Sequence, residues 1–287
     1  IQNTETELTN RLSMQWDFRK YINHLIYYGY SDWAKDTRSL LENKAELNAN
    51  QLETLARAYS AEANDFIHPN QYGLEGGQSA RYPDAGYASI SEERVDGYKL
   101  TYDKGLRAWE RIKSLEPNYT PNIIVDLDLK LANEYMHGYL TMLCIHEYEL
   151  AEEYLQKANY KTPFVEYAKL LLDECELNTI LFTNGDSDTY PLWYVQEKLG
   201  FRKDVLVVNL SLLQTTWYQE MVIDRYKLNS TFSPEILHYI FGRAFVFNGE
   251  EKLNFDEWLK SYQLEVQAQI AQGLKAPPYD EVPGEWM

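Results

Sequence analysis

Residues 179 to 211 constrain the fold more than any other part of this chain. They read Thr-Ile-Leu-Phe-Thr-Asn-Gly-Asp-Ser-Asp-Thr-Tyr-Pro, then an amphipathic stretch, then Asp-Val-Leu-Val-Val-Asn-Leu-Ser. Two short apolar runs flank a helical pattern, which predicts a strand, a helix and a second, parallel strand. In such βαβ units the polar loops at the carboxyl ends of the strands usually carry the ligand site. The first candidate for a functional site therefore lies in this segment.

Polar side chains cluster where the two predicted strands end. The candidate ligand-binding residues are Asn184, Asp186, Ser187, Asp188, Thr189 and Asn209. Their oxygen atoms suit Ca²⁺ or Mg²⁺, with Asp186 and Asp188 as the metal ligands, or they suit the hydroxyls of a sugar. The alternative is structural, because Asp, Ser and Thr before a helix cap it and Asn-Gly is ordinary turn chemistry. We expect the helix itself to start near Tyr190.

The residues before this unit have the three- and four-residue periodicity of helices. A half-motif of a tetratricopeptide repeat occurs twice, with equal spacing. Its positions are Gly105, Trp109, Ile112 and Pro117, then Ala151, Leu155, Ala158 and Pro163. In this motif the small residue lets a paired helix approach, and the Pro ends the unit. The predicted fold is mainly α, with tetratricopeptide-like helical hairpins and a small α/β unit of two short parallel strands.

We divide the chain into three parts. Residues 1–177 form the helical-hairpin region, residues 178–275 hold the βαβ unit and the C-terminal helices packed on it, and residues 276–287 form an extended tail. The tail is too rich in Pro for regular structure to be expected. A long loop at 66–90 is either a binding loop or an ordered insertion. Its candidate binding residues are His68, Tyr72, Arg81 and Tyr87.

Local signals predict where several helices begin. Asn50 and Glu53 have the spacing of a capping box ahead of a helix over 51–64. Residues 125–131 alternate like a strand, but they continue without a turn signal, so we predict a helix there. Residues 212–227 and 255–272 are predicted helices as well.

Composition excludes some partners. The net charge is −17, from 27 basic and 44 acidic residues, so a nucleic-acid backbone would be repelled. No apolar run is long enough to predict a membrane-spanning segment. We expect Cys144 and Cys175 either to be buried as small apolar side chains or to form a single disulfide bridge. Neither cysteine belongs to a zinc motif. The chain opens at Ile1 without an initiator Met, so either a signal segment has been removed or the chain has been shortened at its start. Of the two we favour the first, and with it an exported protein of the periplasm or outer surface.

Two blocks of sequence carry a resemblance to a known family. The first runs from Ile180 through Asn-Gly-Asp-Ser-Asp-Thr-Tyr-Pro, and the second from Gly200 to Tyr218. Together they resemble the stretch after the membrane spans in bacterial multi-pass proteins of the protein O-mannosyltransferase-like class. In that class the turn commonly has Asn and Phe where this chain has Ser187 and Tyr190.

The resemblance covers residues 180–218 and implies a shared soluble module, often found beside tetratricopeptide-like helices. It does not imply the transfer activity, which is expected in the membrane-embedded part that this sequence lacks. It does favour a role for Asp186 and Asp188 beyond helix capping. It also implies a bacterial envelope protein that faces outward.

Three functions fit these observations. The first is a non-catalytic exported binding or scaffold protein that recognises a protein, peptide or glycan partner. The second is a metal-assisted transferase or hydrolase that acts on a sugar or phosphate-bearing substrate at Asp186 and Asp188. An enzyme requires a concave pocket at this turn with a perturbed carboxylate, whereas a binding module requires only an exposed groove. The third is a scaffold subunit of a larger envelope assembly, which requires a sizeable exposed apolar patch. No cofactor follows from the sequence beyond Ca²⁺ or Mg²⁺.

Overall fold

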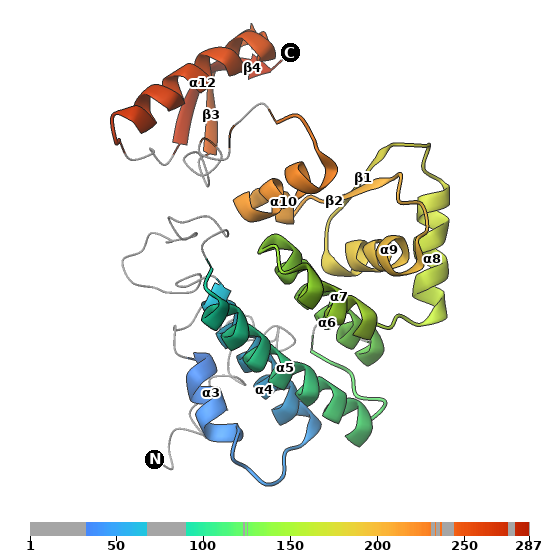
Figure 1. The fold of residues 1–287 in the computed structure, drawn as a ribbon. Coiled ribbons are helices and arrows are strands. Elements are labelled where there is room, and N and C mark those ends of the chain that lie inside the picture. The colour runs from blue at the N-terminus through green and yellow to red at the C-terminus, as the bar shows by residue number, and fades with distance from the viewer. Residues whose placement is uncertain are drawn as a thin grey trace. The chain divides into compact units, whose positions relative to one another are not determined.

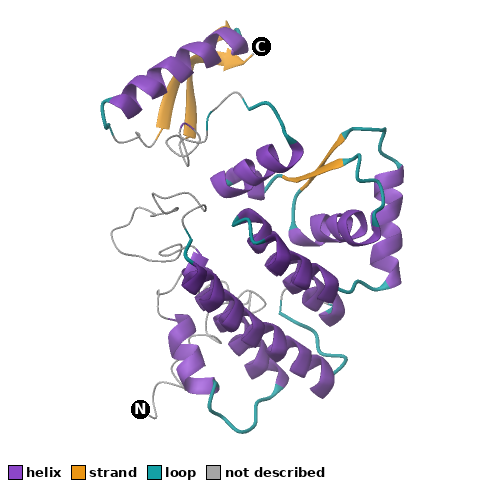
Figure 2. Ribbon diagram, in the orientation of Figure 1, coloured by secondary structure: helices purple, strands orange, loops and turns teal. Residues whose placement is uncertain are grey.

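The chain contains two compact units. One, the helical unit, is Ile1–Thr179 with Asp186–Val205; the other, the strand unit, is Ile180–Gly185 with Leu206–Met287. In this computed structural model the described residues are 33–67, 90–122, 124, 126–230, 233, 236, 244–274 and 279–286. Most of the described elements are helices, as the periodicity predicts (Figure 2). The candidate residues of the 66–90 loop, His68, Tyr72, Arg81 and Tyr87, lie outside the described residues.

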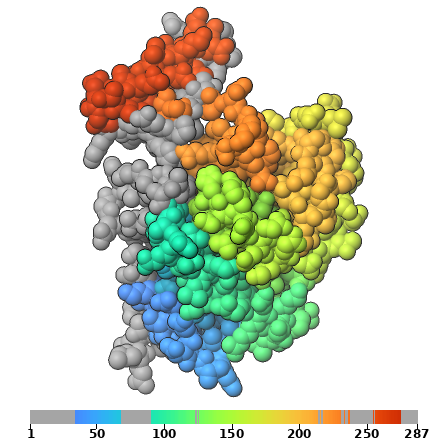
Figure 3. Space-filling view, in the orientation of Figure 1, coloured from blue at the N-terminus to red at the C-terminus, as the bar shows by residue number. Residues whose placement is uncertain are grey.

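The helical unit is built from successive helices that pack in neighbouring pairs (Figure 1). They are α3 (Trp33–Leu41), α4 (Ala49–Ile67), α5 (Glu92–Leu115), α6 (Leu127–Cys144), α7 (Tyr148–Lys157), α8 (Thr162–Asp173) and α9 (Asp186–Leu199). Helix α4 packs on α5, α6 packs on α7, and α8 packs on α9. Helix α6 also contacts α5 and α9. The space-filling view shows α5, α6 and α7 side by side (Figure 3).

Capping side chains explain where α4 and α6 begin. The side chain of Asp126 accepts a hydrogen bond from the Leu129 amide at 2.9 Å, so the alternating segment continues as a helix, as predicted. The capping box of α4 is formed by Asn48 and Gln51. The Gln51 amide donates to Asn48 Oδ1 at 2.9 Å, and the Asn48 amide donates to Gln51 Oε1 at 3.1 Å. The prediction of Asn50 and Glu53 was therefore wrong, because the helix starts earlier and Glu53 is fully buried.

Small residues allow these helices to approach closely. A Cβ atom on Gly105 of α5 would lie 3.1 Å from the Ala56 carbonyl oxygen of α4. Ala151, the equivalent position of the predicted repeat, is buried in α7. Gly105 thus lies where α4 and α5 meet. The tetratricopeptide-like arrangement as a whole stays a prediction.

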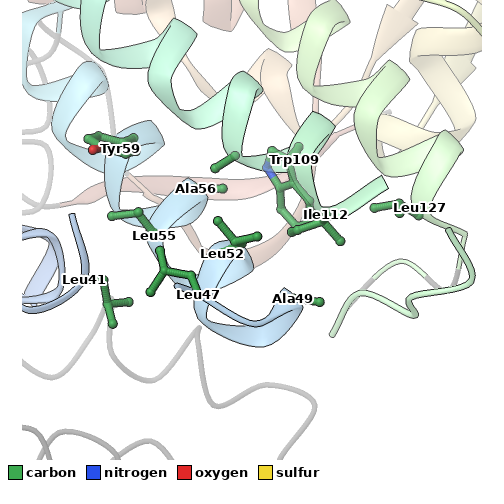
Figure 4. Packing of buried hydrophobic residues seen from close by; sticks show 11 residues of the cluster. Leu41, Leu47, Ala49, Leu52, Leu55, Ala56, Tyr59, Trp109, Ile112 and Leu127 are labelled. Carbon is green, nitrogen blue, oxygen red and sulfur yellow. The ribbon is translucent and has the colours of Figure 1, made fainter. Parts of the chain in front are cut away.

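An apolar cluster holds α3, α4, α5 and the start of α6 together (Figure 4). Helix α4 contributes Leu52 and Ala56, and α5 contributes Trp109 and Ile112, all of them buried. Burying a side chain such as Leu52 stabilises the fold by roughly 1.5–3 kcal/mol. The cluster therefore fixes α4 against α5.

The strand unit begins with the predicted pair of parallel strands. Strand β1 (Ile180–Thr183) pairs with β2 (Leu206–Asn209), with Thr183 opposite Asn209. A short 3-10 helix, η3 (Leu212–Gln214), and α10 (Thr216–Tyr226) follow. The prediction of one helix over 212–227 was wrong, because Thr215 is extended with φ −115° and ψ 135°.

A second two-stranded sheet lies further along the strand unit. Strand β3 (Ala244–Leu253) pairs in parallel with β4 (Tyr279–Trp286), and α12 (Phe255–Ala271) lies between them in sequence. Helix α12 matches the predicted helix at 255–272. The prediction that residues 276–287 lack regular structure was wrong for residues 279–286, which form β4. Pro283 lies between Val282 and Gly284, at the break in register between β3 and β4, and within sheets Pro is typically confined to such irregularities and to edge strands.

Both cysteines are free thiols, with Cys144 buried and Cys175 half-buried. The bridge that the sequence left open is therefore not formed. None of the helices in the described ranges is long and apolar enough to cross a membrane.

Candidate functional site

A cavity of about 210 Å³ lies within the helical unit. Helices α4 and α6 each contribute a stripe of four side chains at helical spacing i, i+3, i+4 and i+7. The stripes are Arg57, Ser60, Ala61 and Asn64 on α4, and Lys130, Asn133, Glu134 and His137 on α6. Trp109 of α5, Ile124 and Asp186 of α9 complete the lining. Asp186 is the one predicted site residue that lines this cavity.

The α4 side of the cavity rests on a buried ion pair. Glu53 is fully buried, and its Oε1 atom accepts hydrogen bonds from Arg57 Nε at 3.0 Å and Arg57 Nη2 at 2.7 Å. The same carboxylate accepts a hydrogen bond from the Tyr119 hydroxyl at 2.7 Å and one from the Asn122 amide at 3.2 Å. The charge of Arg57 is therefore compensated before any ligand arrives.

Trp109 contacts the two cationic side chains of the cavity, Arg57 and Lys130, through its indole ring. The guanidinium carbon of Arg57 lies 5.8 Å from the centre of the indole, and the ammonium of Lys130 lies 5.2 Å from it. Both distances fall within the range of a cation–π contact. Because Trp109 is itself buried in the α4–α5 core, it fixes where these two charges lie.

Lys130 also forms a salt bridge with Glu134, one helical turn further along α6. Burial alone would raise the pKa of Glu134, but the charges of Lys130, His137 and Arg57 and the Lys130 hydrogen bond together hold it below its usual range. Glu134 is thus ionised at neutral pH and paired. Asp186 differs, since no hydrogen bond or salt bridge reaches its carboxylate from the residues that the structure describes.

A buried asparagine ties α9 to α6. Asn133 is 4% exposed, and its Nδ2 atom donates to Ser187 Oγ at 3.2 Å. Its Oδ1 atom accepts a hydrogen bond from the Tyr160 hydroxyl at 2.7 Å. Ser187 is therefore held beside Asn133 of the lining, and this fixes the adjacent Asp186 next to the cavity.

The predicted polar turn is shorter than expected. Helix α9 begins at Asp186 and not near Tyr190, so Asp186, Ser187 and Asp188 form its first turn. Acidic side chains in a first turn interact favourably with the helix dipole, which explains why this sequence enters the helix so early. Asp188 is exposed but does not line the cavity, and Thr189 is fully buried.

The two remaining predicted residues belong to the strand unit. Asn209 is fully buried, and its Oδ1 atom accepts a hydrogen bond from the Leu212 amide at 2.9 Å, which caps η3. The Asn184 carbonyl accepts a hydrogen bond from Ser211 Oγ at 2.6 Å. This bond joins the ends of β1 and β2, as parallel pairing predicts. The contacts of Asn209 are structural, while the Asn184 side chain is exposed.

The geometry offers little to a metal ion. In the described parts of the chain, no three His, Cys, Asp or Glu side chains are grouped so that they could hold one. A Ca²⁺ ion takes six to eight oxygen ligands, and of the two candidate ligands only Asp186 lines the cavity, which it shares with the ammonium of Lys130. The described residues of this cavity therefore do not fit a divalent cation well. Binding of Ca²⁺ or Mg²⁺ stays a prediction.

Sequence reasoning missed the α6 stripe. Lys130, Asn133, Glu134 and His137 recur at i, i+3, i+4 and i+7, and the rest of the helix is largely apolar apart from Asp128 and Thr141. That pattern is also the ordinary solvent-facing side of an amphipathic helix. The signal available in the sequence was a second stripe of the same spacing on α4, because two such stripes can face one cavity.

Comparison with known families gives one match. Residues 164–239 match the family described as TMEM260-associated domain 2. No curated protein and no solved structure matches the chain. The matched segment contains the whole of residues 180–218, on which the resemblance was based, and it includes Asp186 but no other residue of the cavity lining. Over about a quarter of its length, therefore, this chain is similar to TMEM260-associated domain 2, and the protein O-mannosyltransferase resemblance itself stays a prediction.

Proposed function

We propose that this protein is a non-catalytic binding protein whose α4–α6 cavity takes one neutral, hydroxyl-rich unit, namely one sugar residue of a glycan. The proposal depends on a set of polar side chains at the cavity that form no hydrogen bonds with the described residues and can therefore bond to a ligand. Ser60, Asn64 and Asp186 line it, and the described residues form no hydrogen bond with their side chains. A hydroxyl, an amide and a carboxylate together offer both donors and acceptors, as a sugar ring requires.

The charges of the lining favour a neutral ligand. Arg57 and Lys130 oppose a cationic ligand, and Glu134 and Asp186 oppose an anionic one. Three of these four charges already have a partner, since Arg57 pairs with Glu53 and Lys130 pairs with Glu134. A ligand that brought its own charge would have to compete with those partners. A neutral polyhydroxyl ligand would leave both pairs intact.

The size of the cavity limits how much of the partner enters. About 210 Å³ is smaller than the roughly 300–1,000 Å³ of pockets that enclose drug-sized molecules. One monosaccharide fits better than a folded epitope or a long peptide. We therefore expect recognition of a terminal or protruding sugar, with the rest of the glycan outside the cavity.

The proposal includes a tetratricopeptide-like arrangement of the helical unit. Helices α4 and α6 would be the first helices of two hairpins, and α5 and α7, with Gly105 and Ala151, would be the second. Stacked hairpins of this kind form a concave face from equivalent helices. The two polar stripes on α4 and α6 have the spacing expected of such a face.

The test is calorimetric titration of the purified chain with a panel of monosaccharides and short oligosaccharides. Asp186→Asn removes the available charge, and a hydrogen bond to a charged group contributes about 1.5–3 kcal/mol, so affinity should fall roughly 10- to 150-fold. Asp188→Asn is the matched control, because Asp188 lies in the same helical turn but does not line the cavity. If no sugar binds, or if both variants lose affinity equally, the proposal is wrong.

One observation favours a second candidate, a hydrolase or transferase. Glu134, Asp186 and His137 line one cavity, and paired carboxylates carry out glycosyl transfer in many enzymes. Against it, a general acid needs a raised pKa, whereas the pKa of Glu134 is lowered by Lys130. Incubation with glycosides and phosphate esters, with and without Ca²⁺ or Mg²⁺, tests this candidate. Turnover that is lost in Glu134→Gln would favour the enzyme over the binding protein.

The resemblance to the envelope class also supports an exported, outward-facing location as part of the proposal. Digestion of intact cells with an added protease tests it. We expect the protein to be cleaved once the outer barrier is opened and before the cytoplasmic marker is released. Cleavage only together with that marker would contradict export.

A further inference from the structure

Strand β1 of the strand unit has one edge that no other strand covers in the described part of the chain. There β1 pairs with β2 alone, in a sheet of two strands (Figure 1). An uncovered edge presents backbone N–H and C=O groups that can form a ladder with a further strand. The residues that face this edge therefore decide what β1 can bind.

The hydrogen bonds to β2 show which residues these are. The Leu210 amide donates to the Thr183 carbonyl at 2.7 Å, so the backbone groups of Thr183 point towards β2. Along a strand the N–H and C=O groups of successive residues point alternately to opposite sides. The backbone groups of Leu181 therefore also point towards β2, whereas those of Ile180 and Phe182 point to the uncovered edge.

The same two residues expose their side chains. Ile180 is 51% exposed and Phe182 is 56% exposed, and because they lie two positions apart they share one face of β1. Strand β2 differs, since Val208 and Asn209 are buried. The Asn209 amide, which points away from β1, donates to the Tyr218 hydroxyl at 3.1 Å. Of the two strands, β1 is therefore the one that is open to a partner.

The sequence around β1 carries negative charge only. Between Lys169 and Lys198 there are six acidic residues and no Lys, Arg or His. Glu176 precedes β1 by four residues, and Asp188 follows it by five. Both side chains are exposed, and neither forms a salt bridge with any described residue. The chain is thus acidic where it enters β1 and where it leaves it.

The two cations that precede β2 do not offset this charge, because both are paired. Arg202 forms a salt bridge with Asp204 at 2.8 Å, and Lys203 forms one with Glu197 at 3.0 Å. The segments that flank the two strands therefore keep a net negative charge. A partner that complements them has to be basic.

We propose that β1 binds an extended, basic segment of a partner protein as a third strand. Such a segment pairs with the uncovered edge through its backbone, and it places two apolar side chains, two residues apart, on Ile180 and Phe182. Lys or Arg at its ends faces the acidic residues on either side of β1. The net charge of −17 also attracts a basic partner over longer distances. A second copy of this chain would bring the same acidic residues to the edge, and like charges oppose that pairing.

The first test measures binding of a fluorescent octapeptide, Lys-Lys-Val-Thr-Val-Thr-Lys-Lys with both ends capped, to the purified full chain by fluorescence anisotropy. The control peptide has the same side chains and charge but is N-methylated at its four central residues. Loss of these N–H donors should weaken binding by about tenfold or more. Absence of binding overturns the proposal, and so does equal binding of the two peptides, since charge alone would then explain it.

The second test locates the peptide on β1. Phe182→Ser should weaken peptide binding about tenfold, because it removes the larger of the two apolar contacts. Leu264→Ser is the matched control, since Leu264 is an exposed leucine of α12 in the same unit, and its effect should stay below about twofold. Equal effects of the two substitutions overturn the site. The comparison of the two peptides uses the unaltered chain, so it holds even if Phe182→Ser fails to fold.

Sedimentation velocity of the unaltered chain tests the other occupant. We expect a monomer at the concentrations used for anisotropy. Self-association that Phe182→Ser abolishes would show that a second copy covers β1, and it would overturn the proposal of a basic partner. This site does not include the α4–α6 cavity, so its outcome is independent of the glycan test.

Discussion

The buried ion pair beneath the cavity allows a sharp stability prediction. In Glu53→Gln the side chain keeps its shape but loses its charge, and Arg57, whose side chain is only 9% exposed, loses the counter-charge of Glu53. Removing one partner of a buried pair typically costs about 3–5 kcal/mol, because the remaining charge stays desolvated. Adding a separate energy for each of the four hydrogen bonds to Glu53 would predict a larger loss of stability. A glutamine at this position still forms some of these bonds, so the sum overestimates the loss. We therefore expect a loss of about 3–5 kcal/mol.

The assay is urea unfolding followed by circular dichroism, with the free energy of unfolding taken from the transition of the helical unit. Glu153→Gln is the control, because its salt bridge with Lys99 is half-exposed and should contribute less than about 1 kcal/mol. The double variant Glu53→Leu/Arg57→Met should recover part of the loss, since no unpaired charge remains. If Glu53→Gln costs no more than Glu153→Gln, the buried pair does not hold the cavity in place and the reasoning fails.

Two further predictions concern packing and acid stability. In Gly138→Ala the new Cβ would lie 3.0 Å from the Tyr154 ring and 3.1 Å from the Tyr102 ring, both of which are buried and hydrogen-bonded. Overpacking costs about 1–3 kcal/mol and should exceed the helix gain of about 0.5–1 kcal/mol, so urea unfolding should show a net loss. The hydrogen bond from Arg202 lowers the pKa of Asp204 from 3.8 to about 2, so its stabilising contribution is present above about pH 4 and lost as pH falls towards 2. The difference in Tm between the parent and Asp204→Asn should therefore shrink over that interval, and a difference that stays constant would rule out the pairing.

Local patterns predicted the part of the fold that depends on neighbouring residues. The strands at Ile180–Thr183 and Leu206–Asn209 were predictable because each is a short apolar run, and a helical segment between them requires parallel pairing. The residue at which α9 begins was not predictable, because the acidic residues found there suit a helix cap and a first helical turn equally well. The second sheet was missed because β4 finds its partner beyond an entire helix, and its Pro283 reads as irregular structure until the break in register is known.

The candidate site was predictable only in part, for a similar reason. Asp186 stands in a conspicuous polar run and does line a cavity. Asn209 stands in an equally polar position, but its side chain caps η3, and only the hydrogen bond to the Leu212 amide reveals this. The stripes on α4 and α6 are separated by more than sixty residues of sequence, and a polar stripe alone predicts exposure to solvent. That they share one cavity depends on how α5 packs against both helices, which is a property of the tertiary structure.

The most direct test of the central claim is photo-crosslinking with a monosaccharide that carries a diazirine, followed by mass spectrometry of the labelled peptides. We expect labels on residues 57–64 of α4 and 130–137 of α6. We also expect excess unlabelled sugar to suppress these labels, and Asp186→Asn to reduce them while Asp188→Asn does not. Labels spread over other surfaces, or labels that persist in the presence of competing sugar, would contradict a sugar site in this cavity.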